Sequence, residues 1–146
     1  MDIQQIIDAV RGFDGALVIV PDSGPYPELT WGDAFFYFAP TGVMPERTQP
    51  YATITTKDYP DDTAFEVGRD RFRVNIHVGR DRVAELSDAD AQPTGSDAFL
   101  SHPLYGAMGW VCVVNPGERT AEQVLDLLRD AHDAARARML RREQGA

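Results

Sequence analysis

Hydrophobic and polar positions alternate strictly over residues 72–78, which is typical of a half-buried strand. The two sides of this alternation are Phe72, Val74, Ile76 and Val78 on one, and Arg73, Asn75 and His77 on the other. We expect the apolar side to pack on a core. The other side would then present a cation, an amide and an imidazole in a row.

Four further stretches have the composition of strands. Residues 16–20 and 108–114 are apolar runs rich in branched side chains, which predicts that both are buried. The aromatic run at 35–38 favours a strand with apolar surroundings on both faces. The fourth stretch, 51–57, alternates between apolar and polar positions.

The stretch 51–57 is expected to add to the polar surface of 72–78. Its core-facing residues would be Ala52 and Ile54. Its opposite face would carry Tyr51, Thr53, Thr55 and Lys57. If the two strands are neighbours, their polar faces merge, because adjacent strands share face directions.

Helices are predicted at both ends of the chain. Asp2 and Gln5 have the spacing of a capping box, and apolar residues then recur at helical spacing as far as Gly12. Thr120 and Gln123 have the same spacing before a helix that we expect to reach about Met139. The buried stripe of this helix would be Val124, Leu128, Ala131 and Ala135, with Leu125 alongside.

Two segments separate the last two strands. Residues 81–86 favour a short helix, and Ser87 to Ser101 has the composition of a long polar loop, which we expect to be mobile. The order of elements predicts an α+β fold: an antiparallel sheet of about five strands, with the N- and C-terminal helices packed on one face. The other face would be partly open, and residues 1–146 would form a single domain.

The charge balance narrows the classes of partner. The chain has 23 acidic and 14 basic residues and a formal net charge of −9, which opposes binding to nucleic acid and to anionic membranes. The clearest basic excess lies near the C-terminus, at Arg136, Arg138, Arg141 and Arg142. We interpret it as a solvated helix end that complements the helix dipole.

Other sequence features indicate a cytoplasmic protein. The single cysteine, Cys112, excludes an intramolecular disulfide and suggests a reducing compartment. The first residues have no basic region and no long apolar run, so we expect no signal peptide. No stretch approaches the length of a membrane span, so no membrane partner is expected.

Four cations fall in or beside the expected open face, namely Arg47, Lys57, Arg73 and Arg80. Together with the polar residues of the face, they could accept a carboxylate or a phosphate group, since arginine offers a two-pronged donor for such anions. The polar residues concerned are Tyr37, Thr53, Thr55, Asn75 and His77. The alternative is that these cations pair with the abundant aspartate and glutamate side chains.

His77 and His102 are the candidates for acid–base chemistry, with Asp33 as an orienting carboxylate. The ordinary interpretation of each is a hydrogen-bonded strand or turn histidine. The same three residues could form a metal site with two histidines and one carboxylate, but no spacing requires it. Two acidic runs, Asp58, Asp61, Asp62 and Asp88, Asp90, Asp97, lack the spacing of a calcium loop and are interpreted as solvated turns.

A set of short motifs resembles a family of uncharacterised bacterial proteins of unknown function (DUF6194-like). The motifs are Trp31-Gly32-Asp33 with Phe35-Phe36-Tyr37, residues 47–54, Lys57-Asp58-Tyr59-Pro60, residues 72–76, His102-Pro103-Leu104-Tyr105-Gly106, Gly109-Trp110 and Asn115-Pro116-Gly117. This resemblance covers nearly the whole chain and implies no activity. A weaker similarity, to MmcQ/YjbR-like proteins, rests on the order of elements and a Trp-containing last strand. It implies a frataxin-like arrangement and DNA binding, which the acidic charge opposes.

We therefore expect a small cytoplasmic domain that binds a small anionic molecule or a protein partner on the open face of its sheet. The expected ligand-binding residues are Arg47, Lys57, Arg73, Asn75, His77 and His102. The alternatives are a small enzyme that uses His77 or His102, and DNA binding by analogy. No cofactor and no metal is predicted, and an edge strand could support a homodimer.

Overall fold

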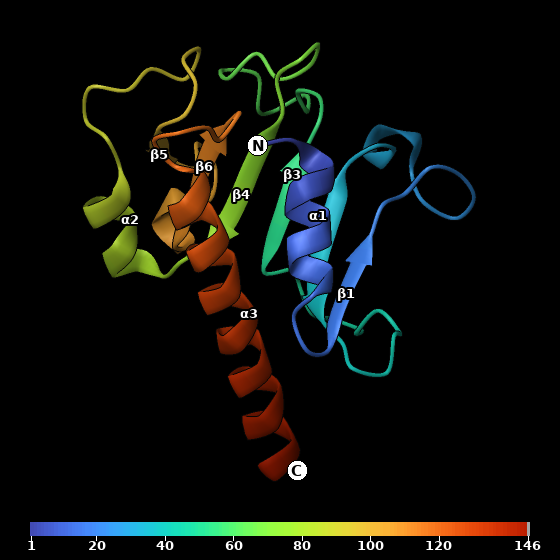
Figure 1. The fold of residues 1–146 in the computed structure, drawn as a ribbon. Coiled ribbons are helices and arrows are strands. Elements are labelled where there is room, and N and C mark those ends of the chain that lie inside the picture. Colours follow the sequence, from blue (N-terminus) through green and yellow to red (C-terminus); the bar gives the residue numbers. More distant parts are fainter. Residues whose placement is uncertain (146) are drawn as a thin grey trace.

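The computed structural model describes residues 1–145 and contains a six-stranded antiparallel sheet with the strand order β1-β2-β3-β4-β6-β5 (Figure 1). The strands are β1 (Ala16–Ile19), β2 (Ala34–Phe38), β3 (Ala52–Thr55), β4 (Arg73–His77), β5 (Phe99–Ser101) and β6 (Trp110–Val114). The first four strands form a meander, and β6 inserts between β4 and β5. The predicted α+β class is confirmed, with one strand more than the five expected.

Two helices cover one face of the sheet. These are α1 (Ile3–Arg11) and α3 (Ala121–Gln144), and Figure 1 shows both in front of the sheet. The third helix, α2 (Arg80–Leu86), lies beside β5 and β6, and two short 3₁₀ turns span Glu28–Thr30 and Gly106–Met108. The C-terminal turns of α3 continue past the lower end of the sheet in Figure 1. They are therefore free to form part of another surface.

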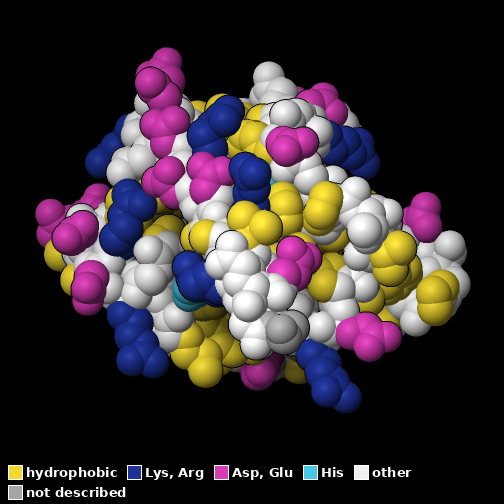
Figure 2. Space-filling model, turned by 90° about the horizontal axis from the view of Figure 1, so that it is seen from below, with side chains coloured by type: hydrophobic (Ala, Val, Ile, Leu, Met, Phe, Trp, Pro, Cys, Tyr) yellow, Lys and Arg dark blue, Asp and Glu magenta, His cyan; other side chains and the backbone are white. Residues whose placement is uncertain are grey.

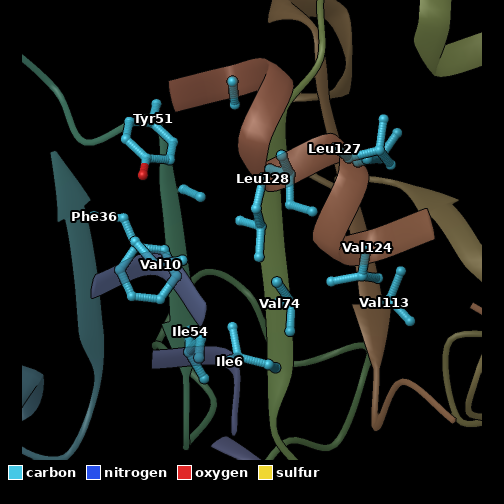
Figure 3. Close-up of a cluster of buried hydrophobic side chains, with 14 of the residues drawn as sticks. Ile6, Val10, Phe36, Tyr51, Ile54, Val74, Val113, Val124, Leu127 and Leu128 are labelled. Carbon is cyan, nitrogen blue, oxygen red and sulfur yellow. The ribbon is translucent and has the colours of Figure 1, made fainter. Parts of the chain in front are cut away.

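The main core lies between these two helices and the sheet (Figure 3). Its fully buried side chains come from α1, α3 and the central strands, and include Ile6, Val10, Phe36, Ile54, Val74, Val113, Val124, Leu127 and Leu128. Burial of apolar surface contributes about 25 cal/mol per Å², so this layer supplies most of the driving force for folding. The apolar side of the 72–78 alternation faces this core, as predicted.

The opposite face of the sheet is less open than the sequence suggests. Phe65 and Val67, from the connection between β3 and β4, pack on Cys112 and Val114 of β6 and form a second small core. This connection also covers part of β4. Arg73, 3% exposed, is therefore buried rather than presented to solvent.

Two expectations about the region before α3 are wrong. The end of the predicted polar loop forms β5, which pairs with β6. The side chain of Thr120 does not cap α3, and no capping box forms with Gln123. The carboxylate of Asp97 instead accepts hydrogen bonds from the backbone of Gly117, Arg119 and Thr120 and from the Thr120 hydroxyl.

Tyr51 also lies elsewhere than predicted. Its ring is buried in the main core, and its hydroxyl bonds Nδ1 of His132 at 3.0 Å. Nε2 of the same histidine lies 2.7 Å from the carbonyl oxygen of Asp14. The side chain of Tyr51 therefore contacts α3 through His132.

Candidate functional site

A cleft of about 750 Å³ lies on the sheet face opposite the helices. Its floor is formed by β2, β3 and β4, and its walls by residues 47–51, 59–62 and 102–110 and by the C-terminal turns of α3. Figure 2 views the molecule from the end where α3 terminates, and shows hydrophobic side chains beside Lys or Arg side chains, with a histidine between them. The same face also carries Asp and Glu side chains, so the surface at this end combines apolar area with charges of both signs.

Five of the six predicted ligand-binding residues line this one cleft, namely Arg47, Arg73, Asn75, His77 and His102. The sixth, Lys57, does not. Its ammonium group donates to the carbonyl oxygen of Trp31 at 2.8 Å and to the carboxylate of Asp33 at 3.2 Å. Arg80 begins α2 and is also outside the cleft.

Asp33 is a structural carboxylate. It is fully buried and accepts hydrogen bonds from the Thr56 amide and hydroxyl, from Lys57 and from the Tyr59 hydroxyl. Burial, followed by the bond to Asp33, raises the pKa of Tyr59. Because Asp33 does not line the cleft, the predicted arrangement in which it orients a catalytic histidine is not present.

The buried pair of Arg73 and Asp62 dominates the polar floor. The two terminal nitrogens of the guanidinium group, Nη1 and Nη2, each bond one carboxylate oxygen of Asp62. The group also lies 4.8 Å from the ring centroid of Phe65. Burial opposes ionisation of Asp62, but the hydrogen bonds and charge of Arg73 outweigh it and hold the Asp62 pKa below its usual value. The charge of Arg73 is therefore compensated within the protein.

Asn75 connects this pair to β3. Its side-chain oxygen accepts from Nε of Arg73 at 2.8 Å, and its amide donates to the hydroxyls of Thr53 at 3.0 Å and Thr55 at 3.4 Å. The register of the sheet explains this contact, because Asn75 pairs with Thr53 and Arg73 with Thr55. The predicted merging of the two polar faces is thus present as a hydrogen-bonded floor.

His102 lies at the side of the floor and is held in its neutral form. Its Nδ1 accepts from the backbone amides of Leu104 and Tyr105, and its Nε2 lies 3.4 Å from Nη2 of Arg73 and 3.9 Å from the Asp62 carboxylate. Burial, and then the charge of Arg73, lowers its pKa to about 4, although Asp62 acts in the opposite direction. This histidine has no ring nitrogen left for a ligand without breaking these contacts.

His77 has one ring nitrogen that is not engaged. Its Nε2 lies 3.2 Å from the carbonyl oxygen of Met108, and its ring contacts that of Trp110 edge-on. Within residues 1–145, the Nδ1 atom of His77 has no hydrogen-bond partner. In residues that are not exposed, every buried side-chain nitrogen or oxygen atom of the same part of the chain does have a partner. The Nδ1 atom is therefore accessible to solvent. Burial, and then the charge of Arg138, lowers the pKa of His77.

Three arginines line the cleft in addition to Arg73, namely Arg47, Arg138 and Arg142. Within the part of the chain that the structure describes, none of the three forms an ion pair. Burial, and then the neighbouring Arg142 and Arg141, lowers the pKa of Arg138. These cations contrast with the net charge of −9 of the whole chain.

The sequence interpretation missed the contribution of α3. Arg138 and Arg142 were assigned to a solvated helix end, yet both line the cleft, with Ala135 and Met139. A signal was present, because positions 131, 135, 138 and 142 continue the spacing of the buried helix stripe. His132 was also missed, and it links α3 to Tyr51 and Asp14 inside the protein.

Among residues 1–145, no group of three or more His, Cys, Asp or Glu side chains could hold a metal ion, which contradicts the site of His77, His102 and Asp33 considered above. Burial raises the pKa of Cys112, whose sulfur lies beneath Phe65 and Val67. Within the same residues, no helix has the length and apolar character required to cross a membrane.

Comparison with known proteins identifies a family. The model of a family described as of unknown function (DUF6194) matches residues 1–144. No curated protein and no solved structure matches the chain. The similarity to MmcQ/YjbR-like proteins stays a prediction.

Proposed function

This chain belongs to the DUF6194 family, which has no established activity, and from its cleft we propose that it binds a small anionic molecule. The observation that carries the proposal is that one cleft brings together three arginines that have no ion-pair partner among residues 1–145. Pockets for small molecules are concave, largely apolar and carry a few convergent polar groups. The volume of about 750 Å³ lies in the usual range of such pockets.

The aromatic lining of the cleft favours a ligand that also has apolar surface. Aromatic side chains line the cleft at Phe35, Tyr37, Tyr105 and Trp110. The floor offers hydrogen-bonding groups that are already oriented by one another, so little side-chain entropy is lost on binding. We therefore assign the cleft to small-molecule recognition in preference to a broad protein surface.

The proposal is tested with two probes that differ in charge. The fluorescent dye 1-anilinonaphthalene-8-sulfonate is an aromatic anion, and N-phenyl-1-naphthylamine is its neutral counterpart. We expect saturable binding of the sulfonate with one site per chain, and binding at least about tenfold weaker for the neutral dye, which corresponds to one charge-assisted hydrogen bond. Native mass spectrometry of gently purified protein would also reveal a ligand retained from the cell.

A pair of neighbouring substitutions locates the binding. Ala135 lines the cleft, whereas Ala134 on the same helix is exposed and does not. Ala135→Phe should reduce sulfonate binding by about tenfold or more by filling the cleft, and Ala134→Phe should leave it unchanged, provided that circular dichroism shows both variants folded. Absence of saturable binding, or equal loss in both variants, would contradict the proposal.

Acid–base catalysis by His77 is a second candidate, favoured by its accessible and unpaired Nδ1. An imidazole held by one ring nitrogen can accept a proton at the other. Its test is a panel of chromogenic esters and phosphate esters. Turnover that His77→Gln removes and Arg141→Gln leaves intact would support catalysis, and rates equal to those in buffer alone would argue against it.

A further inference from the structure

We propose that the ligand of this cleft is an amphipathic monoanion whose charged group is bound by Arg138 and Arg142 of α3, with its apolar body over Trp110 and Met108. The inference rests on the proposed function and adds the chemical class of the ligand and its orientation. It differs from the sequence interpretation, which considered Arg47, Lys57, Arg73 and Arg80 as the cations that accept the anion.

Arg73 and Lys57 are not available to an external anion. Arg73 is 3% exposed and is bound through two nitrogens to Asp62. Lys57 is bound to Asp33 and lies outside the cleft. A ligand anion would have to displace a buried carboxylate to reach Arg73, at the cost of leaving that carboxylate without its partner.

Arg138 and Arg142 of α3, by contrast, are available to an external anion. Arg138 and Arg142 are four residues apart on α3 and so lie on the same face of the helix. Like charges at this spacing destabilise a helix, and a bound anion would relieve this repulsion. The charges that act on Arg138 come from Arg142 and Arg141, and no carboxylate among residues 1–145 pairs with it.

Apolar side chains lie next to these cations on the same cleft. Met108, Leu104 and Tyr105 line it and are 62%, 42% and 47% exposed. His77 joins the two regions, since its ring contacts Trp110 and its charge state responds to Arg138. An arginine end beside an apolar wall fits a molecule with one anionic group and an aromatic or aliphatic body.

The experiment uses the full chain and compares arginines on one helix. Arg138→Gln and Arg142→Gln remove cations of the cleft, and Arg141→Gln makes the same change of charge outside it. We expect each of the first two to weaken binding of 1-anilinonaphthalene-8-sulfonate about tenfold, because a charge-assisted hydrogen bond is lost, with binding of the neutral N-phenyl-1-naphthylamine unchanged. Arg141→Gln should change the sulfonate affinity less than about twofold.

The outcomes separate this inference from the proposed function. If Ala135→Phe abolishes sulfonate binding but all three arginine variants weaken it equally, the probe binds in the cleft without specific contacts to Arg138 and Arg142. That result overturns the inference. If the arginine variants weaken both dyes equally, the arginines act through the shape of the cleft, which also overturns it. If the unchanged protein binds neither dye, both proposals are wrong.

Discussion

Arg73 illustrates at the scale of one residue how burial changes the role of a charged side chain. The strand pattern places it on the polar face of β4, and its side chain is then covered by Phe65 and paired with Asp62. A buried ion pair adds little net stability compared with apolar packing, but removal of one partner leaves an uncompensated buried charge. The pair is therefore best interpreted as a fixed part of the cleft floor.

Asp62→Ala should lower the free energy of unfolding by about 3–5 kcal/mol, because it leaves the buried guanidinium group of Arg73 unpaired. The measurement is urea unfolding followed by circular dichroism. Asp61→Ala is the matched control, since Asp61 is exposed and forms no ion pair within residues 1–145. Similar small effects of about 0.5 kcal/mol or less in both variants would show that the pair is not buried in solution.

His102 should make stability depend on pH. Burial and Arg73 lower its pKa from 6.5 to about 4, so the unfolded chain binds a proton in this range that the folded chain does not. The contribution of His102 to stability is present above the unfolded pKa and is lost as the pH falls toward the folded value. Between about pH 7.5 and about pH 5, we expect His102 alone to decrease the free energy of unfolding by about 2 kcal/mol, and the lowered pKa of His77 acts in the same direction.

His102→Gln should remove most of this decrease, because glutamine does not titrate. The measurement is urea unfolding of the unsubstituted protein and of His102→Gln at each pH. Equal pH dependence in the unsubstituted protein and the variant would show that folding does not lower the pKa of His102.

At the scale of the element, α3 depends on a residue that precedes it by more than twenty positions. Asp97 accepts four hydrogen bonds from the chain that leads into the helix, at distances of 2.6 to 3.0 Å. Burial opposes ionisation of Asp97, but these bonds outweigh it and lower the Asp97 pKa. The segment before β5 is thereby joined to the start of α3.

Asp97→Ala should lower the free energy of unfolding by about 2 kcal/mol, the upper value for loss of a helix cap. Asp97→Asn should restore part of it, because the amide oxygen can still accept hydrogen bonds. Thermal unfolding measures both, and Asp90→Ala, in the same loop and exposed, serves as the control. A loss in Asp90→Ala as large as that in Asp97→Ala would contradict this assignment.

At the scale of the whole molecule, α3 has two parts with different environments. Its buried residues end at His132, and its remaining turns pass the edge of the sheet and form a wall of the cleft. The first part contributes to the core and the second to the site. The two roles should therefore be separable.

A chain that ends at Arg136 should keep the fold and lose the binding. Because no buried residue of α3 is removed, we expect the free energy of unfolding to change by no more than about 1 kcal/mol. Removal of Arg138, Met139 and Arg142 should weaken binding of 1-anilinonaphthalene-8-sulfonate by more than about tenfold. Unfolding of the shortened chain, or unchanged affinity, would contradict this division of the helix.

Local pattern accounts for much of the fold. The alternation at 72–78 and the capping box of Asp2 and Gln5 predicted β4 and the start of α1, because both depend on residues that are close in sequence. β5 escaped prediction because its three residues have little signal alone and are stabilised by pairing with β6.

The site depended on contacts between distant segments. Composition and strand alternation were sufficient to indicate a polar sheet face with Arg73, Asn75 and His77. They could not indicate that Asp62 would neutralise Arg73, or that the end of α3 would supply Arg138 beside His77. A charged side chain is paired or available to a ligand according to which groups the fold brings within a few ångströms of it. The short-range periodicity of a sequence contains no information about distances between remote segments.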